Sequence, residues 1–328
     1  MIRASLPALA IAAFALAACS DGNSSAPITG TSSRAGVNAD APGLDVANSH
    51  IAELNTPAAR NGAGPGGNGN TQMVNHGGPV LTSGINVVAV YWASGTIYNG
   101  GPAAGSTGTG ANDGSLVGHF LRNLGGSPYY NINTTYGVAN SLNYVGFWAN
   151  STNAPSGSQK VTDAQMVSML QSGFNSGQIT YDPNTLYAIF TSGTVNLGGG
   201  FGTQYCAYHY WATVNIGGQS KTVLYAAMPY DAAYPGVCTN GTTSPNNDAG
   251  ADGIVNTLAH EIEETQTDPQ GTAWFDRRGY ENADKCAWTW GTTYKTANGG
   301  TANMSLGGKD FLVQQNWVNT TNACAKAY

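Results

Sequence analysis

The feature that most constrains this chain is the concentration of its acidic residues in one short window. Charged residues make up only 9% of the 328-residue sequence. Yet four of the five glutamates lie between Asp252 and Cys286, in DGIVNTLAHEIEETQTDPQGTAWFDRRGYENADKC. Surface solvation scatters charge along a chain. The clustering therefore favours a site, and the alternatives are a structural ion-pair cluster or an acidic surface with a chance histidine.

The first part of this window predicts an amphipathic helix. Apolar residues recur at i, i+1, i+4, i+5 and i+8 from Ile254, and at about 100° per residue they form one stripe. We expect Asp252 to be the N-cap and Pro269 to end the helix. His260 and Glu264 are four residues apart and project together from the side opposite the stripe.

The sequence HEIEE predicts a metal-binding helix. In HExxH helices the first and fifth residues bind Zn²⁺ and the second is the general base. Here His260 and Glu264 take the ligand positions and Glu261 takes the position of the base. One imidazole with carboxylate oxygens suits Zn²⁺, and Ca²⁺ less well. We expect the third ligand from Glu281 or Asp284, an i, i+3 pair in a later loop.

His209 is a further candidate. It lies in the alternating run QYCAYHYWATVN, where it faces the same side as Ala207 and Trp211. It either points at the metal helix, as a fourth ligand or as a donor to a reaction oxyanion, or packs as an ordinary strand histidine.

The N-terminus predicts export. Residues 1–19 carry one Arg and an apolar run too short to span a membrane. The run ends in LAAC, which resembles a bacterial lipobox in which Cys19 is lipidated, and an ordinary secretory signal is the alternative. We therefore expect a lipid-anchored protein of a bacterial cell envelope, on the outer membrane in a diderm, or a secreted protein. The lipid is its only expected contact with membrane.

The cysteine count agrees with export. Five cysteines become four once Cys19 is removed, and four allow three pairings. We favour two disulfides that each close a loop of about 30 to 40 residues. These are Cys206 with Cys238 and Cys286 with Cys324.

The remaining sequence indicates one domain behind a tether. Residues 20–72 are rich in Gly, Ser, Asn and Pro and predict a disordered tether, whereas residues 73–328 suit a single domain. The net charge of −6, with few basic residues, excludes a nucleic-acid surface. We expect a monomer.

The order of predicted elements indicates an α+β fold with α/β-like features. Strand, helix, strand, helix, three strands and the metal helix follow one another. This is the order of a zincin-like core, a twisted mixed sheet with a backing helix and the HExxE helix, in an otherwise loop-rich chain. Strands are expected at 85–92, 142–148, 185–192, 204–215, 222–229 and 311–317, and helices at 113–124 and 162–173.

Several stretches together carry a family likeness. They are SPNNDAGADGIVNTLAHEIEETQTDP, CAYHY, ENADKC, NHGGPVLTSGINVVAVYW and KDFLVQQNWVNTTNAC. The chain resembles the EXORDIUM, or phosphate-induced protein 1, family over most of residues 75–324. The resemblance implies an exported or cell-wall protein, whose plant members are linked to growth and brassinosteroid response. The lipobox and tether depart from the plant pattern.

Two functional hypotheses follow. In the first, the chain is an exported zincin-like metallopeptidase or amidohydrolase: His260, Glu264 and one of Glu281 or Asp284 bind Zn²⁺, and Glu261 takes the proton of water. In the second, it is a non-enzymatic envelope protein with a structural metal site that binds glycan or a protein partner. The expected ligand is a peptide in the first case and a cell-envelope glycan in the second.

Overall fold

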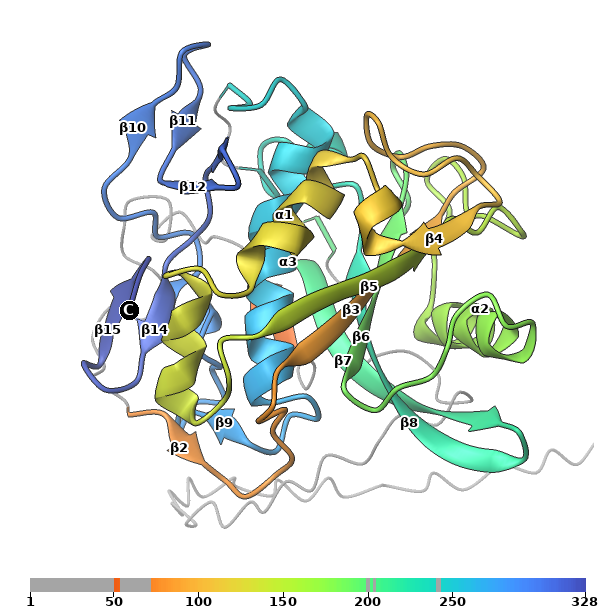
Figure 1. The fold of residues 1–328 in the computed structure, drawn as a ribbon, viewed down its shortest axis with the longest axis horizontal. Helices are drawn as coiled ribbons and strands as arrows, with labels where there is room; N and C mark the ends of the chain where they lie inside the picture. The colour runs from red at the N-terminus through yellow and green to blue at the C-terminus, as the bar shows by residue number, and fades with distance from the viewer. Residues whose placement is uncertain (1–49, 54–71, 199–200, 203–204, 240–242) are drawn as a thin grey trace, which may run out of the picture. The chain divides into compact units, whose positions relative to one another are not determined.

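A twisted seven-stranded sheet is the framework of the fold (Figure 1). The computed structural model describes residues 50–53, 72–198, 201–202, 205–239 and 243–328. The strand order is β1-β7-β8-β6-β3-β5-β4, which confirms the predicted mixed α+β class. The strands are β1 (His50–Glu53), β3 (Ile85–Trp92), β4 (Thr107–Thr109), β5 (Leu142–Trp148), β6 (Thr185–Thr191), β7 (Tyr205–Ile216) and β8 (Gln219–Met228).

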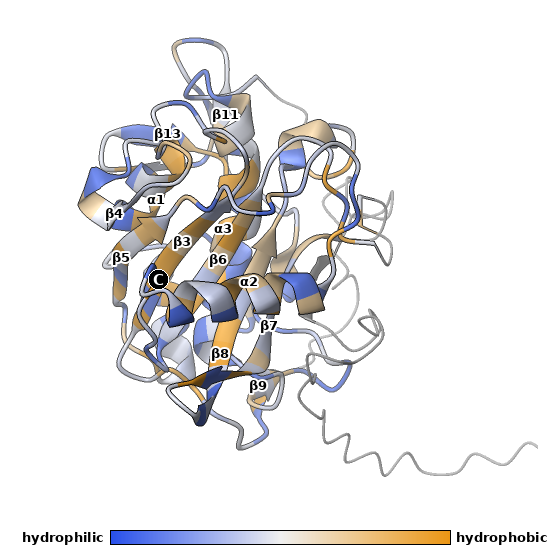
Figure 2. Cartoon of the chain, turned by 90° about the vertical axis from the view of Figure 1, so that its right-hand side faces the viewer, coloured by the Kyte–Doolittle hydropathy of each residue, from blue (hydrophilic) through white to orange (hydrophobic). Residues whose placement is uncertain are grey.

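The centre of this sheet is parallel. β3 pairs in parallel with β5 and β6, and β6 with β8. Parallel strands covered on both faces are apolar along their whole length, and all positions of β6 are buried. Figure 2 shows apolar residues running along these strands. Antiparallel strands lie at both sides: β4 beside β5, β7 beside β8, and β1 beside β7.

Helices cover both faces of the sheet. α1 and α3 pack together on one face and α2 packs on the other (Figures 1 and 2). On β7, Ala207 belongs to the core under α3 and Tyr208 to the core under α2. His209, two residues after Ala207, therefore faces α3. The α-helices of the described residues are α1 (Leu116–Leu124), α2 (Asp163–Asn175) and α3 (Ala249–Thr267).

The α3 helix is more deeply buried than an amphipathic stripe predicts. Residues 250–267 are all buried. The helix also begins earlier than expected, because Asp248 accepts a hydrogen bond from the Ala251 N–H (3.2 Å) and is the N-cap. The prediction of Asp252 as N-cap is wrong. Asp252 instead accepts bonds from the backbone and side-chain N–H groups of Asn246 (2.9 and 2.8 Å) and fixes the preceding loop.

The prediction of a single strand at residues 311–317 is also wrong. One strand ends at Phe311 and the next begins at Asn316. Between them, the Gln314 N–H donates to the side-chain oxygen of Asn256 on α3 (2.7 Å) rather than to a neighbouring strand. The backbone is thereby satisfied outside a ladder, and Gln314 is held against the helix.

Short hairpins and turns form the loop-rich remainder. The hairpins pair β10 with β11, β12 with β13 and β14 with β15, and β2 pairs with β9 from a distant part of the chain. These elements are β2 (Val74–Asn75), β9 (Trp274–Phe275), β10 (Tyr294–Lys295), β11 (Thr301–Ala302), β12 (Met304–Leu306), β13 (Lys309–Phe311), β14 (Asn316–Val318), β15 (Ala323–Ala325) and the 3-10 turns η3 (Gly110–Asn112), η4 (Tyr130–Tyr136), η5 (Asp231–Ala233) and η6 (Asp284–Cys286).

Both predicted disulfides are confirmed. Cys206 on β7 is bonded to Cys238, and Cys286 at the end of η6 is bonded to Cys324 on β15. Disulfides persist in oxidising compartments, which agrees with an exported protein. The second bond ties the ENADKC loop to the C-terminal hairpin.

Most N-terminal predictions lie outside the described residues. This applies to the signal sequence at 1–19, to Cys19 and to most of the tether at 20–72. Within the predicted tether, His50–Glu53 form β1. None of the helices formed by the described residues has the length and apolar character needed to cross a membrane.

The second disulfide gives a test of how the ENADKC loop is held. Replacing both Cys286 and Cys324 by Ala opens a loop with a sequence separation of 38 residues. We expect the free energy of unfolding to fall by about 4 kcal/mol, because the unfolded chain regains loop entropy. Denaturant titration measures it. The Cys206→Ala, Cys238→Ala pair is the matched control for loop length, and an unchanged unfolding midpoint in the first variant would contradict the prediction.

Candidate metal centre

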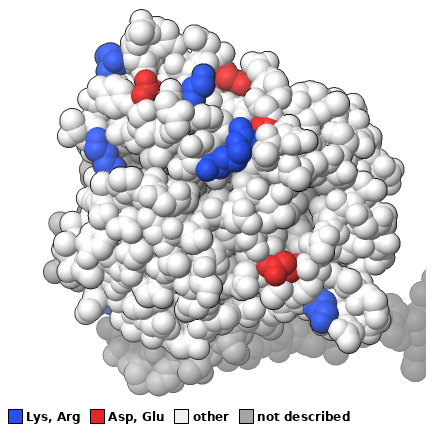
Figure 3. Space-filling model, in the orientation of Figure 1, with Lys and Arg blue, Asp and Glu red and all other residues white. Residues whose placement is uncertain are grey.

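The acidic window lies inside the protein. Charged side chains are sparse on the face shown in Figure 3. Glu261, Glu263, Glu264 and Glu281 are 0% exposed and Asp284 is 4% exposed. An acidic surface with a chance histidine is therefore excluded as an explanation of the cluster. Burial of so many carboxyl groups requires compensation by protons, hydrogen bonds or cations.

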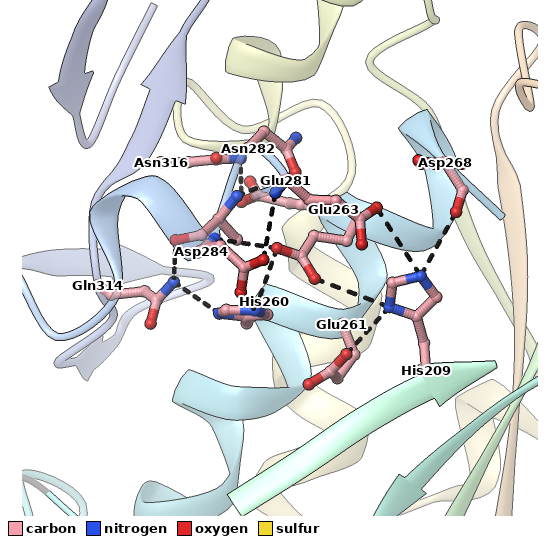
Figure 4. Close-up of polar contacts among 12 residues, drawn as sticks. His209, His260, Glu261, Glu263, Asp268, Glu281, Asn282, Asp284, Gln314 and Asn316 are labelled. Carbon is pink, nitrogen blue, oxygen red and sulfur yellow. Dashed lines mark hydrogen bonds and ion pairs between the residues drawn. The ribbon is translucent and has the colours of Figure 1, made fainter. Parts of the chain in front are cut away.

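A first group of ligand-type side chains comes from α3 and η6 (Figure 4). His260 Nε2 lies 3.1 Å from Glu264 Oε1, one helical turn along, and 3.3 Å from Asp284 Oδ1. The Asp284 N–H donates to Glu264 Oε1 (2.9 Å) and fixes the turn against the helix. These three residues each offer an atom, and the atoms all lie within 4.8 Å of one another. We name them the His260 triad.

A second group shares Glu264 and adds β7. His209 Nδ1 lies 3.1 Å from Glu261 Oε2 and 3.7 Å from Glu264 Oε2. His209, Glu261 and Glu264 again bring ligand atoms within 4.8 Å of one another, and we name them the His209 triad. His209 thus points at α3, which the alternation of β7 allowed but did not decide.

Glu281 lies beside the His209 triad. Its Oε1 is 4.0 Å from His209 Nε2, whereas Asp284 belongs to the His260 triad. Of the two carboxylates predicted to supply a third ligand, Asp284 is the one that belongs to the His260 triad. All six predicted site residues are nevertheless brought together, from β7, α3 and the loop that ends in η6 (Figure 4).

Sequence reasoning missed Gln314, which orients His260. Its side-chain nitrogen lies 2.9 Å from His260 Nδ1 and donates to the Ala283 carbonyl (3.1 Å). Nε2 is therefore the nitrogen that faces Glu264 and Asp284. A partner on the second ring nitrogen is what holds a metal-binding imidazole in place. The only sequence signal was a pair of glutamines that interrupts the apolar run FLVQQNW.

A network of asparagines, also missed, fastens the loop to α3. Asn282 donates to the Asn133 side-chain oxygen (3.0 Å), and Asn133 donates to the Glu263 carbonyl (3.1 Å). Asn316 donates to the Glu263 carboxyl group. Burial raises the pKa of Glu263 well above its usual value, which favours the neutral acid at this position beside the triads.

Burial and like charge shift the protonation of the triads. Burial, followed by the Asp284 charge, raises the pKa of Glu264 to about 7. Burial alone lowers the pKa of His260, but Glu264 and Asp284 raise it well above its usual value. His209 has a raised pKa for the same reason, with Glu261 as the main partner. Three carboxyl groups thus face two imidazoles in a site that is buried from bulk solvent.

Some carboxylate oxygens at the triads lack a hydrogen-bond donor. Glu261 Oε1 and Glu264 Oε2 are buried and accept no hydrogen bond from the described residues. Asp284 Oδ1 is also buried, and His260 Nε2 lies 3.3 Å from it. Buried polar atoms nearly always have such a partner. The set of one imidazole nitrogen and carboxylate oxygens fits Zn²⁺, whereas Ca²⁺ prefers six to eight oxygens. The residues present therefore fit a bound divalent cation.

The raised pKa values predict the pH dependence of the metal-free protein. Glu264 changes from an ordinary value of 4.5 to about 7 on folding. The folded state thus binds a proton more tightly, so its contribution to stability is complete below about pH 4.5 and is lost as pH rises through about 7. The raised pKa of the histidines acts in the same direction.

We therefore expect the chelator-treated protein to lose free energy of unfolding between about pH 5 and 8. Denaturant titrations at several pH values measure this, and Glu264→Gln, which cannot titrate, should show a shallower dependence. A metal-free stability that rises with pH over this range would contradict the assignment.

Comparison with known proteins places the site in a family. Residues 128–327, which include β7, α3, η6 and Gln314, match the model described as "Phosphate-induced protein 1 conserved region". Protein EXORDIUM-like 3 of Arabidopsis thaliana is 30% identical over 165 residues, 42% of this chain and 48% of that protein. Protein EXORDIUM-like 5 of the same plant is 25% identical over 195 residues, 51% and 53% of the two chains.

The chain thus spans about half the length of these curated relatives. No solved structure matches it. The family model covers more than half of the chain and every side chain of both triads, and the chain belongs to the phosphate-induced protein 1 family.

Proposed function

We propose that the chain is an exported, zincin-like metalloprotein that hydrolyses peptide or amide bonds at the His260 triad. The observation that carries this proposal is the convergence of His260, Glu264 and Asp284 within 4.8 Å, with a Glu264 oxygen that accepts no hydrogen bond from the described residues. The arrangement of α3 beneath a mixed sheet, with α1 packed behind it, supports a zincin-like core. Anchoring through Cys19 is part of the proposal.

In this proposal the His260 triad holds Zn²⁺. His260 supplies Nε2, and Glu264 and Asp284 supply one oxygen each, with Glu281 as the next carboxylate. Three protein ligands leave one position open, as in catalytic rather than structural zinc sites. Zn²⁺ at such a site activates water and polarises a carbonyl group.

Glu261 acts as the general base. Its Oε2 lies 3.1 Å from His209 Nδ1, and its Oε1 has no donor among the described residues. The contact with His209 fixes the carboxyl group. Oε1, which has no donor, is left to accept the proton of the attacking water. The Glu261 and Glu264 charges raise the pKa of His209 and favour its protonated form. His209 is therefore our candidate donor to the oxygen that becomes negative when the carbonyl is attacked.

A second candidate function rests on a separate pocket of about 970 Å³. It lies between α2 and the ends of β3 and β5, and all residues that line it are uncharged. Trp92, Trp148 and Asn150 are among them, together with Ser and Gln side chains of α2. Aromatic rings with amide and hydroxyl groups suit a neutral glycan. In that case an ion bound at the triads would have a structural role. The burial of the triad side chains favours such a role.

Metal analysis of ligand variants tests the site itself. We expect the purified chain to bind about one Zn²⁺, and His260→Ala or Asp284→Asn to weaken zinc binding by more than about 100-fold. Competition with a chelating dye measures the affinity, and circular dichroism reports the fold. Glu263→Gln is the matched control, because Glu263 is equally buried but belongs to neither triad. An equal loss of zinc affinity in all three variants would contradict the assignment of the His260 triad as the zinc site.

The base is tested separately by Glu261→Gln. This variant keeps the shape of the side chain and the His260 triad, but it cannot accept a proton. We expect it to retain Zn²⁺ and to lose about 10²- to 10⁴-fold in hydrolysis of casein or a peptide library. Cleavage at the rate of the unsubstituted chain would exclude Glu261 as base. Zinc binding without any hydrolysis, together with binding of neutral polysaccharide, would favour the second function.

A further inference from the structure

The strand β1 lies where all parts of the candidate site meet. It pairs antiparallel with β7, with His50 opposite His209, Ile51 opposite Tyr208 and Glu53 opposite Tyr205. β1 is also close to α3 and to η6. These three neighbours carry His209, the HEIEE residues and Asp284. A short N-terminal strand therefore lies against every element that supplies a triad side chain.

The site is closed in this arrangement. His260, Glu261 and Glu264 are 0% exposed and His209 is 1% exposed. A hydrolase that acts on peptides needs access to these groups, so some element must move aside. α3 is buried along its length, and η6 is bonded through Cys286 to Cys324. β1, in contrast, is a four-residue strand with one neighbour in the sheet.

An edge strand without β1 would present free backbone groups beside His209. Such an edge binds an extended peptide by adding it to the sheet, with main-chain hydrogen bonds giving the affinity. The register of β1 shows that a chain segment placed there runs antiparallel to β7 and passes His209. A substrate peptide that lies across the site is expected to have this same antiparallel geometry.

We propose that the edge of β7 beside His209 is a binding site for an extended peptide, and that His50–Glu53 occupy it as an internal competitor that closes the metal centre. The peptide is a substrate only if the proposed hydrolytic function holds, whereas its binding at the edge does not depend on that function. Because β1 belongs to the same chain, it competes at a high effective concentration. A free peptide then binds with an affinity reduced by the fraction of molecules in which the edge is open.

Displacing β1 in the full chain tests this proposal. Ile51→Pro with Ala52→Pro removes two backbone donors and disfavours the strand. The control, Ala58→Pro with Ala59→Pro, changes two residues beyond the paired register. Both are made in the Glu261→Gln background to prevent cleavage. The probe is a fluorescein-labelled peptide NSHIAELNT, residues 48–56, with a scrambled peptide of the same composition beside it.

We expect the β1 variant to bind the probe at least about tenfold more tightly than the control, by fluorescence anisotropy. Equal affinities, with both proteins folded by thermal melting, would overturn the proposal. If the β1 variant melts early, a protease site inserted after Ala58 and cut in the folded protein replaces it, and cutting should raise probe affinity by the same factor. Unchanged affinity after complete cutting and removal of the released peptide would again overturn it.

The two proposals fail in different ways. With Glu261 restored, the β1 variant should cleave casein faster than the control. Tighter probe binding without cleavage, in zinc-loaded protein, would uphold the peptide-binding edge and reject hydrolysis. Faster cleavage with unchanged probe affinity would uphold hydrolysis and reject β1 as the competitor.

Discussion

The burial of carboxyl groups on α3 is the constraint on which the rest of the structure depends. A wholly buried helix normally carries apolar side chains on every face, yet α3 carries His260 and three glutamates with no exposure. The cost of burying charge is met in two ways. Burial raises the pKa of Glu263 and favours its neutral form, while Asn316 donates a hydrogen bond to its carboxyl group. The triads gather imidazoles around carboxylates whose remaining oxygens suit a cation.

The surrounding elements hold this arrangement against like-charge repulsion. Asp284 lies beside Glu264 because its own backbone N–H donates to that carboxylate, so an attractive contact accompanies the repulsive one. The Cys286–Cys324 disulfide and the bond from Asn282 to Asn133 hold the loop from both sides. A site assembled from three segments far apart in sequence needs such fixed supports, because small displacements of ligands weaken metal binding and catalysis.

Sequence patterns predict the features that depend on residues near one another in the chain. They fail for the features that depend on contacts between residues far apart in sequence. The spacing of His260 and Glu264 follows from one helical turn, and four cysteines limit the disulfide pairings to three. The N-cap was misplaced because Asp248 and Asp252 have equally suitable side chains, and the loop contact with Asn246 decides between them. Gln314 could not be found because its partners, on α3 and in the ENADKC loop, are distant in sequence. The apolar run around it therefore suggested a strand.

Burial strengthens the electrostatic contacts within the site and also makes the site inaccessible to a substrate. A medium without water strengthens each electrostatic contact around His260 and Glu264, and the same enclosure excludes a substrate. Opening through α3 would expose the core, and opening through η6 would strain a disulfide-linked loop. Release of β1 exposes backbone groups that water or another strand can satisfy, at the cost of one short ladder. Because β1 is a four-residue strand at the edge of the sheet, its release is the route to the buried site that we propose.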